Sequence, residues 1–158
     1  MATTYNDEST SSTPYMLHLF PDSQANVNVC RHIPLLHEKR PWTGSLAAVG
    51  GNTSITHVGT QVLGVLDRFG EFVELRVPGT HGCPNASPDH MILGTSAEVY
   101  GIFYDSHNKR VLTKAGDDIP TPRNTKNVDS TDAILIPPDY SPTNIDSELG
   151  RKYNEWLK

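Results

Sequence analysis

Repeated strand signals fill residues 44–77, which read GSLAAVGGNTSITHVGTQVLGVLDRFGEFVELRV. Apolar residues alternate with charged ones over residues 72–77, which is the pattern of a strand with one buried face. Turn-forming residues around Gly50 and Gly70 divide the stretch, and Gly59 predicts a bend or bulge. Short strands at this spacing predict an all-β fold, either a small closed barrel or a sandwich.

The sequence on either side extends this domain to residues 15–114. An apolar strand is predicted at residues 15–20, ending at Pro21, and a buried strand at residues 91–94. One short helix is expected at residues 95–99, followed by a last hairpin of residues 100–104 and 111–113. Residues 33–43 are interpreted as a connection, and residues 78–88 as a polar loop.

Both ends of the chain are polar. Residues 1–14 predict a flexible lead, and residues 115–158, rich in Pro, Asp, Asn and Thr, predict a linker-like tail. A short helix is expected at residues 147–158, because Leu149, Tyr153, Trp156 and Leu157 fall on one side of it.

Composition restricts the partners. The chain has 158 residues, a net charge of -5 and a mean hydropathy of -0.43. An acidic chain without basic runs argues against nucleic-acid binding through phosphates. No apolar run approaches the roughly 20 residues that span a bilayer, and the first residues lack a signal-peptide pattern. We therefore expect no membrane partner, an intracellular protein of the cytoplasm or nucleus, and reduced thiols at Cys30 and Cys83.

The segment that follows the first strand, residues 22–30, reads DSQANVNVC. It resembles the signature of copia-type retrotransposon proteases, in which Asp-Ser-Gly-Ala-Asn begins a strand. The order of later motifs is similar to that family too. They are VGGNTSI at residues 49–55, GTQV at 59–62, VPG at 77–79 and GIFYD at 101–105. The resemblance covers about residues 15–114.

This resemblance implies a retropepsin-like fold, in which each chain supplies half of an aspartic protease and a homodimer completes it. Asp22 would be the catalytic aspartate, and Ser23 its neighbouring hydroxyl. Residues 91–94 (MILG) resemble the segment that braces the catalytic loop, and residues 50–57 would form the flap over the substrate groove. The substrate-binding residues implied by the resemblance are Ala25, Gly51, Asn52 and Thr53. No cofactor is implied.

The loop departs from the family pattern at three positions. Gln24 stands where the family has Gly, which is used where a side chain would intrude on a close approach. Pro21 precedes the aspartate, where a residue with a free N–H is expected. Asn28 replaces a His. Without the resemblance, Asp22 would be interpreted as a surface turn residue, because Pro-Asp-Ser is ordinary turn chemistry.

Histidine and cysteine do not predict a metal site. His32 with Cys30, and His81 with Cys83, are the only close pairs, and this i, i+2 spacing is a weak zinc signal. Ser54 with His57 lacks an orienting acid, so it does not predict a triad. We expect no metal.

Two functions follow. The favoured hypothesis is a retroelement-derived, homodimeric module that binds a peptide or protein segment in its groove, with weak or lost peptidase activity because of Gln24. The alternative is an active dimeric aspartic endopeptidase that processes a retrotransposon polyprotein, with Asp22 as the catalytic residue. An unrelated small β domain is the third interpretation. Aspartic proteolysis needs two carboxylates that share a proton, so one such loop per chain requires a dimer.

Overall fold

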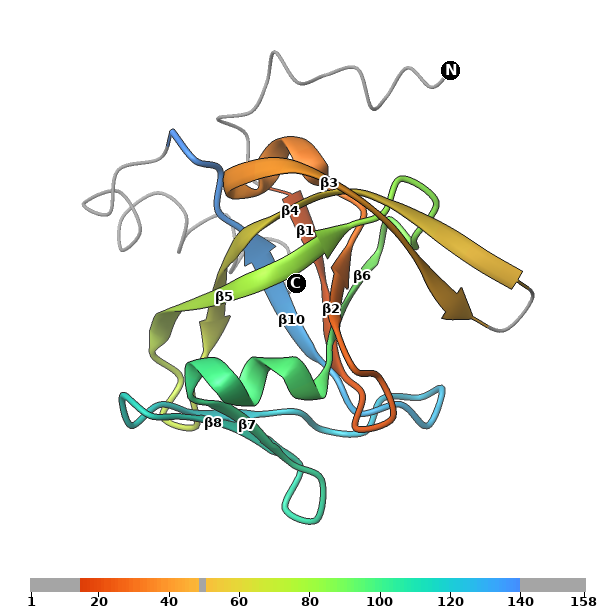
Figure 1. Ribbon diagram of the computed structural model, residues 1–158. Helices are drawn as coiled ribbons and strands as arrows, with labels where there is room; N and C mark the ends of the chain where they lie inside the picture. Colours follow the sequence, from red (N-terminus) through yellow and green to blue (C-terminus); the bar gives the residue numbers. More distant parts are fainter. Residues whose placement is uncertain (1–14, 49–50, 140–158) are drawn as a thin grey trace.

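The computed structural model describes residues 15–48 and 51–139, which form ten strands and two short 3-10 helices (Figure 1). The predicted lead at residues 1–14 and the predicted helix at 147–158 lie outside the described residues. The elements are β1 (Tyr15–Pro21), β2 (Asn28–Cys30), η2 (Ile33–Leu35), β3 (His37–Ala48), β4 (Gly51–Leu66), β5 (Phe72–Gly82), β6 (His90–Leu93), η3 (Thr95–Tyr100), β7 (Ile102–Asp105), β8 (Arg110–Thr113), β9 (Asp118–Pro120) and β10 (Thr131–Leu135).

Seven of these strands form one sheet in the order β10-β1-β6-β2-β5-β4-β3, and β10 also pairs with β4. This extra pairing closes six strands into a barrel and leaves β3 as an additional strand on β4. Closure removes most of the open edges that a small antiparallel sheet would expose. The predicted all-β fold with a closed barrel is confirmed.

The first two strands are separated by a strand from much later in the chain. β6 pairs in parallel with β1, with His18 opposite His90, and antiparallel with β2, where Val29 lies opposite Ile92. The chain therefore leaves β1, passes over the end of β6 and returns as β2. The Asp22 loop is this crossing.

Alternating side chains of the barrel strands fill its interior. Leu17 and Leu19 of β1 are buried, as are Leu63 and Val65 of β4, and they belong to one core cluster. Their i, i+2 spacing places each pair on the same side of its strand. Burying each such side chain contributes about 1.5–3 kcal/mol.

A second layer covers the end of the barrel where the Asp22 loop lies. β7, β8 and β9 form a separate antiparallel sheet, and η3 runs between this sheet and the barrel (Figure 1). Ile102, Val111 and Ile119 point from the small sheet into the main core. The helix ends at Gly101, whose φ of 80° is left-handed and suits a residue without Cβ.

Two predictions about the segments between the strands are wrong. Residues 115–139 are not all linker, because β9 lies in them and β10 pairs with β1 and closes the barrel on β4. The run Ala133–Ile136 is short and buried throughout, so it lacks the alternation that identifies a strand facing solvent.

The other wrong prediction concerns residues 33–43 and 78–88. β3 begins at His37 and β5 continues to Gly82, although Pro41 and Pro78 suggested loops. Register shifts in β3 on either side of Pro41 show how the sheet accommodates a residue that cannot donate a ladder hydrogen bond.

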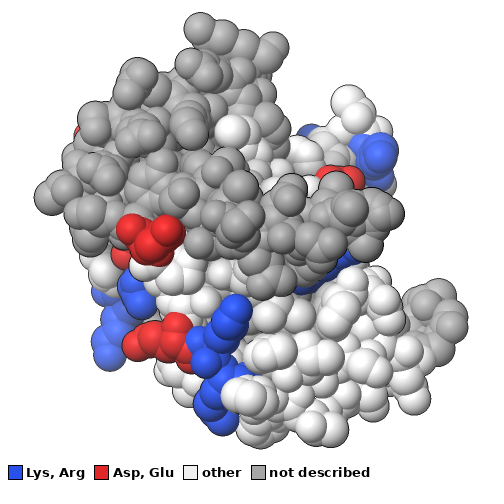
Figure 2. Space-filling view, turned by 90° about the horizontal axis from the view of Figure 1, so that it is seen from above, with Lys and Arg blue, Asp and Glu red and all other residues white. Residues whose placement is uncertain are grey.

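Charges on the surface are mixed. Figure 2 shows basic and acidic side chains next to one another on the face seen from above. Ion pairs such as Arg76 with Glu74, at 3.7 Å, accompany this mixture. Within the described part of the chain, no helix is long and apolar enough to cross a bilayer.

Candidate functional site

The Asp22 loop is held by main-chain hydrogen bonds. The Asp22 N–H donates to the Leu93 carbonyl at 2.9 Å, at the end of β6. On the other side, the N–H groups of Thr95 and Ser96 donate to the carbonyls of Ala25 and Asn26. The hydrogen bond to β6 uses the N–H of Asp22. Pro21, which has no N–H, is the residue before it, so Pro21 removes no hydrogen bond from this arrangement.

Gly94 and Asn28 complete the attachment of the loop. The Gly94 N–H donates to Asn28 Oδ1 at 2.8 Å, and Asn28 is fully buried. A Cβ on Gly94 would lie 2.3 Å from the Val27 carbonyl oxygen, closer than any side chain can approach. The segment Met91-Ile92-Leu93-Gly94 therefore braces the loop, and Asn28 holds it in place.

Gln24 fits the loop without backbone strain. The described non-glycine residues with positive φ are Glu38, Lys109 and Asn127, so Gln24 does not adopt the left-handed conformation that favours glycine. Its N–H donates to Asp22 Oδ1 at 2.9 Å, which is an Asx turn, and its side chain is exposed. Gln24 therefore places its side chain on the surface.

Asp22 and Ser23 line two neighbouring clefts. The smaller one, about 30 Å³, is enclosed by this pair together with Gly94, Glu98 and Tyr104. The larger one, about 260 Å³, has residues of the segment Arg123–Asp129 as its other wall. Among the described residues, no hydrogen bond joins Asp22 to a second carboxylate, so one chain does not contain an aspartic dyad.

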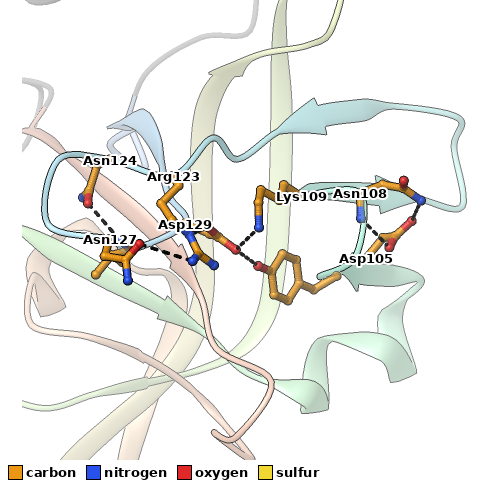
Figure 3. A network of polar contacts seen from close by, with 9 residues as sticks. Asp105, Asn108, Lys109, Arg123, Asn124, Asn127 and Asp129 are labelled. Carbon is orange, nitrogen blue, oxygen red and sulfur yellow. Dashed lines mark hydrogen bonds and ion pairs between the residues drawn. The ribbon is translucent and has the colours of Figure 1, made fainter.

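A polar network forms the far wall of the larger cleft (Figure 3). Asp129 accepts hydrogen bonds from Tyr104 Oη at 2.7 Å and from Arg123 Nε at 3.0 Å. Lys109 Nζ lies 3.7 Å from the same carboxylate. These donors and cations lower the pKa of Asp129, because they stabilise its charged form. Burial and the nearby Asp129 charge raise the pKa of Tyr104 to about 12.

Asparagines shape the hairpin that carries this network. Asn124 Oδ1 accepts from the N–H groups of Lys126 and Val128, and Asn127 takes a left-handed φ of 65°. Arg123 and Asp129 face each other across an isolated bridge. Sequence analysis missed Tyr104, Arg123 and Asp129. The available signal was the turn-rich stretch Asn124-Thr125-Lys126-Asn127, which was attributed to a linker.

The predicted substrate-binding residues fall in two places. Ala25 lies in the Asp22 loop, and its N–H donates to the Asp22 carbonyl at 3.1 Å. Gly51, Asn52 and Thr53 begin β4 near the tip of the β3–β4 hairpin, and Asn52 and Thr53 line neither cleft beside Asp22. Figure 1 shows this hairpin projecting to the side of the barrel, apart from the loop between β1 and β2. The structure therefore does not bring the two sets together in one chain.

The underside of the hairpin does reach residues that flank the loop. Leu46 and Ile55 from the hairpin pack in one cluster with Val27, Val29 and Ile92. Val27 and Val29 follow the Asp22 loop, and Ile92 precedes the carbonyl that accepts its N–H. A mostly buried apolar cluster thus connects the hairpin to the strands that flank the loop.

Both cysteines and His32 are buried in this arrangement. Both cysteines are free and buried, and burial raises the pKa of Cys30 to about 12 and that of Cys83 to about 11. Burial also lowers the pKa of His32, whose Nε2 lies 2.7 Å from the Pro88 carbonyl. Among the described residues, no three His, Cys, Asp or Glu side chains are grouped to hold a metal ion.

Comparison with known proteins does not identify the site. No family model, no curated protein and no solved structure matches this chain.

Proposed function

We propose that this chain is a retroelement-derived domain similar to copia-type aspartic proteases, which forms a homodimer and binds peptide segments, with weak or lost peptidase activity. The observation that carries the proposal is that hydrogen bonds hold the loop Asp22-Ser23-Gln24 at the end of β6. The Leu93 carbonyl and the Gly94–Asn28 hydrogen bond hold this loop from below. These hydrogen bonds distinguish the Asp22 loop from an ordinary surface turn.

The need for a second copy follows from chemistry. Aspartic proteolysis requires two carboxylates within about 2.6–3.2 Å, one acting as base while the other donates a proton. Among the described residues of one chain, Asp22 has no hydrogen-bonded carboxylate partner. A two-fold axis beside the loop would pair Asp22 with its own copy.

Gln24 supports weak activity. Its side chain is exposed at the surface that the second loop must approach, and its N–H already engages one oxygen of Asp22. Peptide binding needs no proton shared between two Asp22 carboxylates, so it does not require that approach to be close. Binding can therefore persist where cleavage has weakened.

The alternative is an active dimeric endopeptidase, favoured by the retention of Asp22 and Ser23 side by side in the braced loop. Both residues line the clefts beside the loop, so the carboxylate is accessible. In this case Asp22 would activate the water that attacks a peptide bond.

The test combines self-association with cleavage. Sedimentation of the full chain at micromolar concentration should show a two-chain species. Turnover of a mixed peptide library at mildly acid pH should be weak or absent, and Gln24→Gly should raise it in a manner that Asp22→Asn abolishes. Robust, inhibitor-sensitive cleavage by the unmodified chain would favour the enzyme. A strict monomer would end the homodimer proposal and any claim to aspartic catalysis.

A further inference from the structure

A row of side chains runs across three barrel strands next to the Asp22 loop. Ile92 of β6 lies opposite Val29 of β2, and Val29 lies opposite His81 of β5. Directly opposed residues on neighbouring strands point to the same face of a sheet, so these three share one surface. Leu46 and Ile55 of the hairpin cover its apolar part.

Trp42 extends this row from above. Its ring meets the His81 ring edge-on, with the centroids 6.4 Å apart at 76°. The Trp42 side chain remains 43% exposed, so part of the indole faces solvent. A Cβ on Gly44 would lie 3.5 Å from the indole nitrogen, so the glycine leaves that side of the ring uncovered.

The charge beside Trp42 is positive and unbalanced. The Arg40 guanidinium carbon lies 5.3 Å from the centre of the Trp42 ring. Within residues 15–48 and 51–139, neither Arg40 nor Lys39 forms an ion pair, whereas Glu38 pairs with Arg76 at 3.9 Å. Among the described residues no ion pair engages the Arg40 guanidinium, which lies over the Trp42 ring, so this pair complements an apolar group close to an acidic one.

We propose that Trp42 and Arg40 on the β3–β4 hairpin determine which peptide segment binds, and that this segment carries an apolar side chain with an acidic side chain two positions away. Residues i and i+2 of an extended peptide point to the same side, so one packs on the indole while the other pairs with the guanidinium. This inference rests on the proposed peptide-binding function and names the chemistry of its ligand.

The probe is an acetylated, amidated octapeptide, Ala-Gly-Ala-Leu-Ala-Glu-Ala-Gly. Two matched peptides replace its Glu by Lys or its Leu by Ser. Titration calorimetry with the full chain should show binding of the first peptide, and a dissociation constant about tenfold higher or more for each of the other two. In a Trp156→Phe background Trp42 is the sole indole, and its fluorescence should change on binding.

Variants separate the two contacts. Trp42→Ala should weaken the Leu-Ala-Glu peptide about tenfold or more, and Arg40→Gln should abolish the preference for Glu over Lys. Phe69→Ala is the matched control, because Phe69 is 73% exposed and the Arg68 guanidinium carbon lies 4.7 Å from its ring centre, but it lies in the β4–β5 turn. The Phe69→Ala variant should bind the Leu-Ala-Glu peptide as tightly as the unmodified chain does.

Two results would overturn the inference. If Trp42→Ala bound the Leu-Ala-Glu peptide as tightly as the unmodified chain does, Trp42 would not contact the peptide. The proposed peptide binding itself would be unaffected by that result. Failure of the unmodified chain to discriminate among the three peptides, or to bind them, would overturn recognition of this side-chain pair. Sedimentation of the full chain tests the proposed homodimer independently of peptide binding.

Discussion

The two walls of the larger cleft are stabilised in different ways. The Asp22 loop is held through its main chain and buried Asn28, while Ser23 and Gln24 are exposed. The opposite wall is held by side chains, with Asp129 receiving Tyr104 and Arg123. A loop held by its backbone tolerates substitution at an exposed position such as Gln24, so it can keep its shape when that side chain changes. A wall held by side chains cannot.

The largest effect is expected from the brace. Gly94→Ala should lower the free energy of unfolding by about 3 kcal/mol, because the new Cβ would meet the backbone of Val27 at 2.3 Å. Gly44→Ala is the control, since its Cβ would have no neighbour closer than 3.5 Å. Urea denaturation measures both. A Gly94→Ala variant as stable as the control would show that the loop is not held there.

A smaller loss is expected from the side-chain wall. Asp129→Ala should cost about 2 kcal/mol, because it removes charged hydrogen bonds from a carboxylate that is only 10% exposed. Tyr104→Phe removes one of these bonds and should cost about 1 kcal/mol. A double-mutant cycle should show that the two losses are not additive. Additive losses would mean that Tyr104 and Asp129 act independently.

The pH dependence of stability should distinguish the same carboxylate. The folded-state pKa of Asp129 is lowered from 3.8, so its contribution is present above pH 3.8 and is lost as pH falls through the folded pKa. Thermal unfolding should therefore show a steeper acid loss in the unmodified chain than in Asp129→Asn. Parallel curves below pH 4 would contradict the network.

His32 should add a loss at milder acidity. Burial lowers its folded-state pKa below 6.5, so the unfolded chain binds a proton first as pH falls. The free energy of unfolding should therefore decrease below pH 6.5, and His32→Gln should flatten that slope. An unchanged slope in the variant would assign the acid sensitivity to other groups.

The smallest effect on the free energy of unfolding is expected at Gln24. Gln24→Gly should change the free energy of unfolding by less than about 0.5 kcal/mol, because the side chain is exposed and its φ is not left-handed. Chemical denaturation of both forms provides the measurement. A large change in either direction would mean that the Gln24 side chain, and not the main chain, shapes the loop.

Local sequence patterns predicted the parts of the fold that carry alternation or strong turn signals. Residues 72–77 alternate and lie in β5, and the bulge expected at Gly59 occurs as a register shift between Gly59 and Gln61. β10 was missed because both its faces are buried, so its pattern is a short apolar run near two prolines. Asp22 was found by resemblance. Its opposite wall was missed because Tyr104 and Asp129 are far apart in the sequence and only the fold brings them together.

The most direct test of the proposed homodimer is the distance between its two Asp22 loops. Gln24→Cys places one exposed thiol in each loop for a spin label, while Cys30 and Cys83 are buried with pKa values raised to about 12 and 11 and should stay unlabelled. If the two Asp22 carboxylates meet, dipolar spectroscopy of the labelled full chain should give one interchain distance below about 25 Å. A monomer, or a dimer whose labels lie well beyond that distance, would contradict the account.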